Sequence, residues 1–385
     1  MRDKILNMRN EFDVCIIGGG QGGIIAAISL KRQGINVCII EAKDRIGKKI
    51  LSTGNGKCNI LNADLSLSNY NNSFPSKAFQ TYDITKLKEF YGSLGLLLKQ
   101  DSEGRIYPYS ESANTVLNAY LDELNKLDIP VFINTKIESI KPGYTLYSKD
   151  QEFKCKAIIL ATGSNATTGI CSHALFAPFG HKTTKLEQSL VPIKTNALKG
   201  ANGVRAKAKA SLYISNKLVF SENGELLFKD NQLSGILAFK MSAYIAREYV
   251  KNNKLNAFIE IDFVPDYTEE QIKDVLSKSK LQDPLQGLLH KAIAQNFKGD
   301  NIPYDIKHKV CKVDGLMGID NAQVVSGGLD ISQFDENTMG SKLQKGLYAI
   351  GEVLDVDGQC GGYNLSFAAA SALLCADSIK NELCK

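Results

Sequence analysis

A glycine-rich triplet near the start of the chain has the residue types and spacing that bind the pyrophosphate of a dinucleotide. Gly18, Gly20 and Gly23 form the pattern GxGxxG. The first glycine permits a tight turn, the second lets the backbone approach a phosphate, and the third lets a helix pack close to a strand. Free N–H groups at the start of that helix would bind the phosphates. Glu41 follows Gly20 at the spacing of an acid that binds a ribose hydroxyl.

Two buried strands and a helix are the elements that must position these residues. The β-branched runs at 14–17 and 37–40 are typical of strands buried on both faces. Residues 24–33 between them have helical periodicity, and Gly34 ends the helix. The triplet alone would be compatible with a glycine-rich turn in another α/β protein. The complete strand–helix–strand unit favours a dinucleotide site.

The segment after Glu41 is rich in Gly, Lys and Asn and has no clear period. We expect residues 42–62 to form a long loop that returns over the cofactor, because loops of this length in compact domains are usually functional. Arg45, Lys48 and Lys49 are interpreted either as partners of phosphate charge or as solvated surface charges. The small and amide residues of Ser52–Asn59 would let the backbone approach a flat ring.

Two later motifs are typical of flavoproteins with the two-dinucleotide-binding arrangement. A buried strand at 157–160 ends in Ala161-Thr162-Gly163, and a strand at 346–350 runs into Gly351-Glu352. A glycine-rich approach then leads into a small-residue helix at 365–382. The acid can bond a ribityl chain, and the helix N-terminus can stabilise negative charge on a reduced flavin ring. Because there is no second GxGxxG, a nicotinamide cofactor would dock transiently.

Three segments are expected: a first part of the cofactor domain, an insert, and the return of the cofactor domain. Their predicted limits are 1–190, 191–330 and 331–385. In the first part we expect helices at 85–98 and 112–126, a strand at 131–133 and a β-meander at 137–156.

The insert is predicted to be β-rich, with a helical part at about 264–300. Strands are expected at 208–214, 217–221 and 225–228, with a turn at Asn223-Gly224 between the last two. Two amphipathic helices are expected within 266–298, and Thr268 followed by Gln271 resembles a capping box.

Composition limits the class of protein. The chain has 385 residues, 44% apolar and 23% charged, with a net charge of +5. This is typical of a globular protein of two or three domains and tolerates a polyanionic partner without requiring one. The charged beginning of the chain, with no long apolar run, predicts a cytoplasmic protein without a membrane span. The nine cysteines form no CxxC pattern, which predicts reduced thiols and no metal site.

Five stretches together resemble the BaiN-like (YhiN-type) flavoproteins over most of the chain: GGGxGG, IGKKILSTGNGKCNILN, GRIYPYSESA, ILATG and GLYAIGEVLDVDGQCGGYNLSFAAASA. The resemblance implies an α/β, Rossmann-like FAD domain with an inserted β-barrel-like piece and a small helical piece. It implies FAD contacts at Gly18, Gly20, Gly23, Glu41, Cys58, Asn59, Gly163, Gly351, Glu352, Gly362 and Asn364. We add their neighbours in the same motifs: Gln21, Gly22, Ala42, Lys48, Thr53, Gly54, Ala161, Thr162, Gly361 and Tyr363.

The resemblance implies several activities: reduction of a uridine in large-subunit rRNA with NADH, reduction of unsaturated bile-acid intermediates, and oxidation of amines such as aminoacetone. The leading hypothesis is an FAD-dependent oxidoreductase that uses NADH or NADPH to reduce an activated C=C bond, with rRNA uridine as the substrate. The alternatives are a small-molecule enone or steroid-type reductase, an aminoacetone-type amine oxidase, and a non-catalytic or RNA-binding flavoprotein.

Candidates for the proton donor lie in the segments expected near the flavin ring. Cys58 is the first choice and Cys360 the second, with Tyr109 and Tyr363 as weaker candidates; Cys58 is alternatively a packing residue. The sequence differs from the family pattern at Ser164–His173, where a glycine-rich stretch is usual. It also reads LSGI rather than LSGP at 233–236.

Overall fold

The computed structural model describes residues 10–166, 172–196, 198–252 and 255–384, and these form two compact units. The first unit contains residues up to 165, then 172–185, and the chain from 327 onward. The second unit contains 186–326 together with Ala166. The first unit is therefore assembled from segments on both sides of the second.

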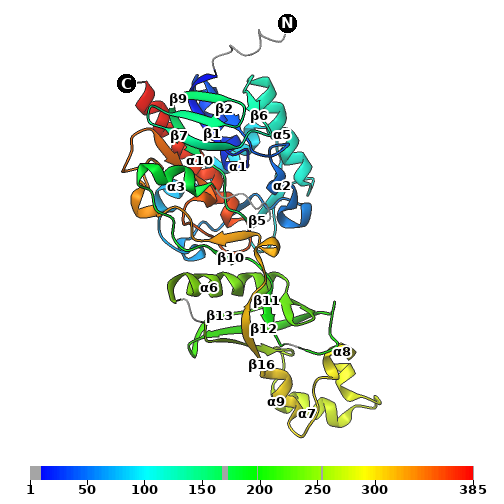
Figure 1. Ribbon diagram of the computed structural model, residues 1–385. Helices are drawn as coiled ribbons and strands as arrows, with labels where there is room; N and C mark the ends of the chain where they lie inside the picture. The colour runs from blue at the N-terminus through cyan, green and yellow to red at the C-terminus, as the bar shows by residue number, and fades with distance from the viewer. Residues whose placement is uncertain (1–9, 167–171, 197, 253–254, 385) are drawn as a thin grey trace. The chain divides into compact units, whose positions relative to one another are not determined.

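The first unit is built on a seven-stranded sheet whose core strands are parallel (Figure 1). β1 lies in the middle, between β2 and β9, and β18 extends the parallel part beyond β9. The N-terminal half of β9 also pairs with β8, in the antiparallel direction, and β8 pairs antiparallel with β7. The strands are β1 (Glu11–Ile17), β2 (Val37–Ile40), β6 (Val131–Phe132), β7 (Ile137–Lys141), β8 (Thr145–Ser148), β9 (Glu152–Leu160) and β18 (Leu347–Ala349). This confirms the predicted Rossmann-like fold.

Apolar helices cover this sheet. α1 (Gln21–Arg32) follows β1 directly and packs against α10 (Tyr363–Leu383), the small-residue helix from the end of the chain. Gln33 Nε2 donates to Asp377 Oδ1 at 2.9 Å and ties the far end of this helix pair. The other helices are α2 (Lys48–Ser52), α3 (Ser76–Thr81), α4 (Ile84–Ser93) and α5 (Ala113–Lys126).

The region between the second strand and the first long helices differs from the prediction. The expected loop at 42–62 contains α2, a 3-10 helix at Thr53–Gly56 and the short strand β3 (Leu61–Asn62). The helix predicted at 85–98 is observed as α4, which ends five residues early at Ser93. The last predicted residue, Leu98, belongs to the strand β4 (Leu98–Gln100). These short elements form a second sheet, β3-β5-β4, completed by β5 (Arg105–Pro108).

The second unit contains a closed six-stranded barrel in the order β11-β14-β13-β12-β15-β16. Its apolar interior residues form a core separate from that of the first unit. The barrel strands are β11 (Ile193–Thr195), β12 (Arg205–Ile214), β13 (Lys217–Lys229), β14 (Gln232–Ser234), β15 (Ala257–Asp262) and β16 (Lys309–Leu316); β10 (Glu187–Ser189) and β17 (Val324–Ser326) pair beside it. The insertion of a β-barrel piece is confirmed.

Two details of the insert were predicted wrongly. The expected turn at Asn223-Gly224 does not exist, because both residues pair with β12 in the continuous strand β13. A long helix, α6 (Ile236–Asn252), follows the barrel hairpin in a stretch that was expected to be β-rich and for which no helix was predicted. The helical part contains α7 (Glu269–Lys278), α8 (Lys291–Ala294) and α9 (Ile302–Lys307). The predicted capping box of Thr268 and Gln271 is present at the start of α7.

Candidate functional site

The turn between β1 and α1 contains three glycines of the predicted motif. Packing requires glycine at Gly18 and Gly23 but not at Gly20. Gly18 has φ +109°, and a Cβ there would lie 2.5 Å from the carbonyl oxygen of Ala161. A Cβ on Gly23 would lie 2.0 Å from the carbonyl oxygen of Gly18. At Gly20, by contrast, no protein atom lies within 4 Å of the Cβ position. The protein itself gives no steric reason for glycine at this position, which suits the close approach of a ligand.

The start of α1 has the donors that an anion needs. Gly20 is the N-cap residue and supplies no side-chain cap, and the first turn contains no acidic residue. The first hydrogen bond of the helix is donated by Ile24 N to the carbonyl oxygen of Gly20. The N–H groups of Gln21, Gly22 and Gly23 therefore have no acceptor within the helix and can bind a ligand. Gly20 and Gly22 are partly exposed here.

Glu41 lies beside this turn at the end of β2. Its Oε2 accepts a hydrogen bond from Gly19 N at 2.8 Å, and its Oε1 accepts one from Lys43 N at 2.9 Å. The two bonds fix the carboxylate at the carboxyl edge of the sheet, where α/β folds bind their ligands. Each oxygen keeps a lone pair for a ribose hydroxyl.

A second carboxylate, that of Glu352, joins three segments that follow three different strands. Lys49 Nζ lies 2.8 Å from Glu352 Oε2, and Ser164 Oγ donates to Glu352 Oε1 at 2.7 Å. A Cβ on Gly163 would lie 3.4 Å from Glu352 Oε2. The predicted residues Gly163, Gly351 and Glu352 therefore lie together. Sequence reasoning missed the contacts of Lys49 and Ser164 with this acid, because Lys49 was expected to be either a phosphate partner or a solvated surface charge.

The N-terminus of α10 forms the third part of the cluster. Gly362 has φ +94°, and a Cβ there would lie 2.7 Å from Asn59 Oδ1 and 2.5 Å from the carbonyl oxygen of Leu61. Asn62 Nδ2 donates to the carbonyl oxygen of Gly361 at 2.8 Å. The structure thus brings the predicted segments 53–59 and 361–364 together. They lie 300 residues apart in the printed sequence, at about residue 60 and about residue 360.

The side-chain amide of Asn364, another predicted cofactor residue, forms hydrogen bonds within the protein. Its Oδ1 accepts from Gly358 N at 2.8 Å and its Nδ2 donates to Gly358 O at 2.9 Å. The amide therefore closes the glycine-rich approach onto the helix. Tyr363 packs on the same segment, since a Cβ on Gly358 would lie 2.7 Å from the Cβ of Tyr363.

Several predicted cofactor residues carry buried polar atoms without a hydrogen-bond partner among the residues that the structure describes. These atoms are Gln21 Oε1, Asn59 Oδ1 and Thr162 Oγ1. Buried polar atoms in native proteins are nearly always paired, so each one requires an explanation. They come from the three motifs that meet at this edge of the sheet. A dinucleotide has the hydroxyl, phosphate and ring groups that would pair with them, so the residues present fit such a group.

Three predicted cofactor residues take part in local contacts at the margin of the cluster. Lys48 forms an ion pair with Asp44, one turn earlier in the chain. Thr53 Oγ1 donates to the carbonyl oxygen of Ile50 at 2.6 Å, and Ala42 is half-buried after β2. The positive charge of Lys48 is therefore already matched locally.

The two cysteines considered as proton donors lie in different environments. Cys58 is fully buried, and burial raises the pKa of its thiol to about 11. Its φ of +57° is unusual for a residue with a side chain. Cys360 is partly exposed and precedes Gly361 at the start of α10. A fully buried thiol cannot contact a substrate in this conformation, which favours packing as the role of Cys58.

The stretch in which the sequence differs from its family begins at Ser164. Residues 167–171 lie outside those that the structure describes. His173 is buried, and burial lowers the pKa of its imidazole. The LSGI stretch lies at the end of β14 and the start of α6, with Gly235 at φ +91°.

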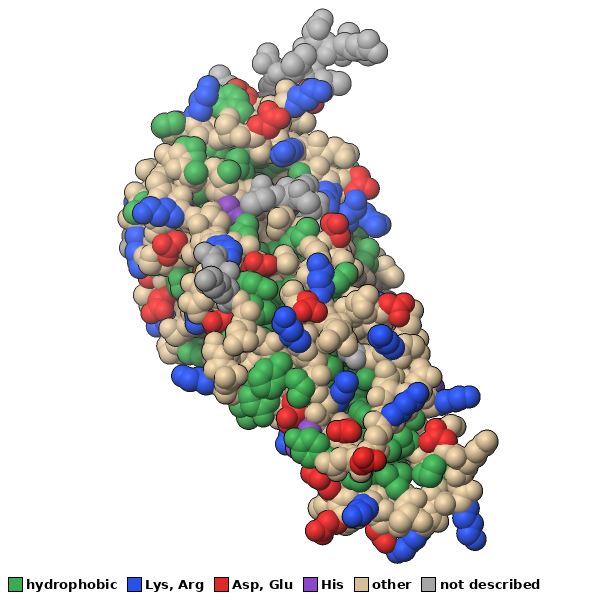
Figure 2. Space-filling view, turned by 60° about the horizontal axis from the view of Figure 1, so that its bottom comes forward, with side chains coloured by type: hydrophobic (Ala, Val, Ile, Leu, Met, Phe, Trp, Pro, Cys, Tyr) green, Lys and Arg blue, Asp and Glu red, His purple; other side chains and the backbone are tan. Residues whose placement is uncertain are grey.

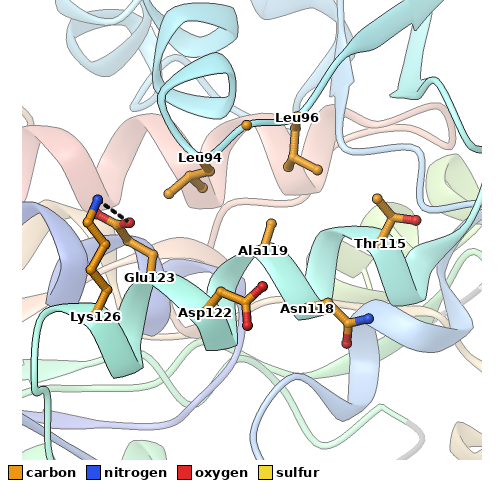
Figure 3. A pocket seen from close by; sticks show the side chains of 9 residues that line it. Leu94, Leu96, Thr115, Asn118, Ala119, Asp122, Glu123 and Lys126 are labelled. Carbon is orange, nitrogen blue, oxygen red and sulfur yellow. Dashed lines mark hydrogen bonds and ion pairs between the residues drawn. The ribbon is translucent and has the colours of Figure 1, made fainter.

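A groove elsewhere on the first unit involves none of these residues. It has a volume of about 380 Å³ and lies between the turn after α4 and one face of α5 (Figure 3). Glu123 at its edge pairs with Arg32 at 2.8 Å and with Lys126 at 3.4 Å. The groove is lined by Leu94, Gly95, Leu96, Thr115, Asn118, Ala119, Asp122, Glu123 and Lys126.

The described part of the chain contains neither a metal-binding cluster nor a membrane-spanning helix. No cluster of three or more His, Cys, Asp or Glu side chains is arranged to hold a metal ion in it. Within the same residues, no helix has the length and apolar character needed to span a bilayer.

Comparison with known proteins identifies relatives over nearly the whole chain. The family model described as HI0933-like protein Rossmann domain matches residues 12–378. A 3-dehydro-bile acid delta(4,6)-reductase of Clostridium scindens is 31% identical over 93% of this chain and 97% of that protein. A ribosomal RNA dihydrouridine synthase of Haemophilus influenzae is 26% identical over 95% of this chain and 98% of that protein.

The solved structures confirm the fold. The 3-ketosteroid delta1-dehydrogenase of Sterolibacterium denitrificans, solved with 1,4-androstadiene-3,17-dione, superposes with a TM-score of 0.54 over 97% of this chain and 100% of that chain. The two sequences are 12% identical, so this similarity concerns the architecture alone.

Proposed function

We propose a reaction for this chain, which belongs to the HI0933-like Rossmann-domain family and is an FAD-dependent oxidoreductase. In this proposal it reduces a C=C bond that is conjugated with a carbonyl group in a small molecule. The observation that carries the proposal is the meeting of three motifs at one edge of the sheet. Each contributes a buried polar atom that a bound dinucleotide would pair: Gln21, Asn59 and Thr162.

Each part of the cluster has a distinct task in holding FAD. The N–H groups at the start of α1 would bind the pyrophosphate, and Glu41 would accept the ribose hydroxyls of the adenosine half. Glu352, held by Lys49, would orient the ribityl chain. Bound FAD supplies hydride transfer, which no amino-acid side chain provides. The N-terminus of α10 carries a partial positive charge that favours the extra negative charge of a reduced ring.

NADH or NADPH is the proposed electron donor. The chain has one dinucleotide fingerprint, so the nicotinamide would bind transiently and leave after hydride transfer. Among the described residues the cysteines are free thiols, so no disulfide relay carries electrons. A donor of this kind is consistent with a cytoplasmic enzyme.

The names of the two relatives describe the same chemical change. A delta(4,6)-reductase acting on a 3-dehydro compound saturates C=C bonds in conjugation with a 3-oxo group, and a dihydrouridine synthase saturates the C5=C6 bond of uridine beside a carbonyl. In both, hydride would add to the carbon remote from the carbonyl, and a proton to the carbon next to it. We propose this reaction for the present chain.

Charges on the barrel favour a small molecule over ribosomal RNA, and so reverse the order of substrates expected from the sequence. In the strand register Lys207 lies opposite Glu225 and Lys209 lies opposite Asp262. These two acids form ion pairs with Arg205 and Lys307, respectively. Figure 2 shows basic and acidic side chains interspersed on the face in view. RNA-binding surfaces instead cluster their Lys and Arg residues. Uridine in rRNA is the second candidate, supported by the relative at 26% identity.

Anaerobic stopped-flow spectroscopy tests the proposal. The FAD-loaded protein should be bleached by NADH or NADPH within seconds and should recover its colour when a 4-ene-3-oxo steroid or 2-cyclohexen-1-one is added. A short stem-loop RNA containing unmodified uridine serves as the competing oxidant. Bleaching by an amine such as aminoacetone, with peroxide formed in air and no response to nicotinamides, would assign the protein to the amine oxidases.

A further inference from the structure

Reduction of a conjugated C=C bond needs a proton donor beside the hydride donor, and the structure offers one that the sequence did not suggest. The inference rests on the proposed function. Cys58 is fully buried, so its thiol cannot reach a substrate in this conformation. Tyr109, a weaker candidate, is 63% exposed, and its ring lies under the ammonium of Lys99 at 5.5 Å.

Tyr107 lies close to two segments that are predicted to contact the flavin. It belongs to β5, where Ile106 and Pro108 are buried, so alternation turns Tyr107 toward the opposite face of the small sheet. Its Cε1 atom is 3.7 Å from the Cβ position of Gly54 in the first segment. Cys360, in the second segment, is near enough to Tyr107 to influence its phenol electrostatically.

A hydrogen bond keeps these two segments in fixed relation to the tyrosine. Asn62 pairs with Arg105 across the sheet, two residues from Tyr107, and donates through Nδ2 to the carbonyl oxygen of Gly361 at 2.8 Å. The strand that carries Tyr107 is therefore connected through β3 to the start of α10. The position of Tyr107 relative to the start of α10 is therefore set by the pairing of β5 with β3 and by the side-chain hydrogen bond of Asn62.

The hydroxyl of Tyr107 is available to a ligand. No hydrogen bond joins it to any of the residues that the structure describes, and the side chain is half-buried. Other tyrosines of this unit have internal partners: Tyr70 donates to the carbonyl oxygen of Tyr363 at 2.9 Å, and Tyr82 donates to Asp377. A half-buried phenol without an internal partner, beside a segment predicted to contact the cofactor, fits a general acid.

We propose that the Tyr107 hydroxyl is the general acid of the reductive step and gives its proton to the carbon next to the substrate carbonyl. The balanced step adds two hydrogens across the C=C bond. Hydride, derived from NADH or NADPH, bonds to the carbon remote from the carbonyl. The O–H bond of Tyr107 breaks as the new C–H bond forms. The resulting phenolate then takes a proton from water, which reaches it through its exposed side.

The surroundings keep the phenol in the state that a proton donor needs. Burial raises the pKa of Tyr107, while the positive charges of Arg105 and Lys57 act in the opposite direction. The net direction is upward, so the hydroxyl is protonated throughout the neutral range. The rate of the protonation step should therefore be flat there and fall only in strongly alkaline solution.

The test compares Tyr107→Phe with Tyr109→Phe in the FAD-loaded full-length protein, with the two half-reactions measured separately. Tyr107→Phe should be bleached by NADH or NADPH at the wild-type rate. Its reoxidation by 2-cyclohexen-1-one should be roughly 10²–10⁴-fold slower at saturating enone, the usual contribution of a general acid. Tyr109→Phe should behave as the wild type in both half-reactions. The alkaline decline of the wild-type rate should be absent from Tyr107→Phe.

Other outcomes contradict the assignment in distinguishable ways. Reoxidation of Tyr107→Phe within about threefold of the wild type would overturn the role of this residue and leave the proposed function intact. A loss in Tyr109→Phe instead would transfer the role to that residue. Wild-type protein that neither the enone nor a 4-ene-3-oxo steroid reoxidises would overturn the proposed function and the role together. Normal FAD content and reductive rate in Tyr107→Phe show that the variant is folded.

Discussion

Alanine substitutions at Gly18 and Gly20 should separate the stability of the fold from the affinity for FAD. At Gly20 the backbone has φ −79° and ψ −176°, which any residue adopts, and the added methyl group meets no protein atom within 4 Å. The protein without FAD should therefore lose less than about 1 kcal/mol, the loss expected at an N-cap. FAD affinity should fall at least about tenfold, or roughly 1.4 kcal/mol, because the methyl group occupies the approach of the pyrophosphate.

Gly18→Ala should have the opposite profile. Its φ of +109° costs a side-chain-bearing residue about 1–3 kcal/mol, and the methyl group would also overlap the carbonyl oxygen of Ala161 at 2.5 Å. A total of about 3 kcal/mol corresponds to a fall in Tm of roughly 6–12 °C for a unit of this size.

The assay measures Tm of both flavin-free variants by circular dichroism and FAD Kd by quenching of flavin fluorescence. If Gly20→Ala bound FAD like the wild type, or destabilised the flavin-free protein as much as Gly18→Ala, the assignment of Gly20 to the pyrophosphate would be wrong. The comparison is informative because both variants add the same methyl group two residues apart.

Further predictions concern the two carboxylates and the buried thiol. Glu41→Ala should weaken FAD binding by about 1–3 kcal/mol in equilibrium titration without changing the visible spectrum of the bound flavin, since it removes a charge-assisted contact to the ribose far from the ring. Lys49→Met and Glu352→Gln should each weaken FAD binding, and their effects should be non-additive by about 1 kcal/mol in a double-mutant cycle, because they break one ion pair; additive effects would mean independent roles. Because burial raises the pKa of Cys58 to about 11, its thiol should remain unlabelled by iodoacetamide at pH 8 while the exposed Cys384 reacts; peptide mass mapping distinguishes the two.

The elements with a strong period or a complete motif were predicted well from the sequence. The first strand–helix–strand unit, the strand before Ala161 and the helix at the end of the chain follow from apolar runs bounded by glycine, and their positions are confirmed. In each case the local preference and the tertiary environment favour the same structure. The first dinucleotide motif belongs to this class in part, because Gly18 and Gly23 are required by packing, whereas packing does not require a glycine at Gly20.

The errors occur where tertiary contacts decide the local structure. Asn223-Gly224 is a frequent turn pair, yet pairing with β12 on one side holds both residues in an extended strand. A Cβ on Gly224 would lie 3.0 Å from Leu237, so the glycine accommodates α6 and does not form a turn. A single sequence contains no signal for that helix contact. In the site, Lys49 was visible as a charge, but its partner lies about 300 residues away.

β9 and β18 are far apart in the sequence, and this separation limits the order in which the two units can fold during synthesis. The pairing of Leu347 with Ile158 and the packing of α10 on α1 must wait until residues 347–383 have left the ribosome. At about 5–20 residues per second, the first strands are exposed for on the order of ten seconds or more before β18 arrives. The contiguous barrel unit can fold in that interval. A nascent chain cut short before Leu347 would retain an unpaired edge on β9 and an uncovered apolar face on α1, features that recruit chaperones and proteases.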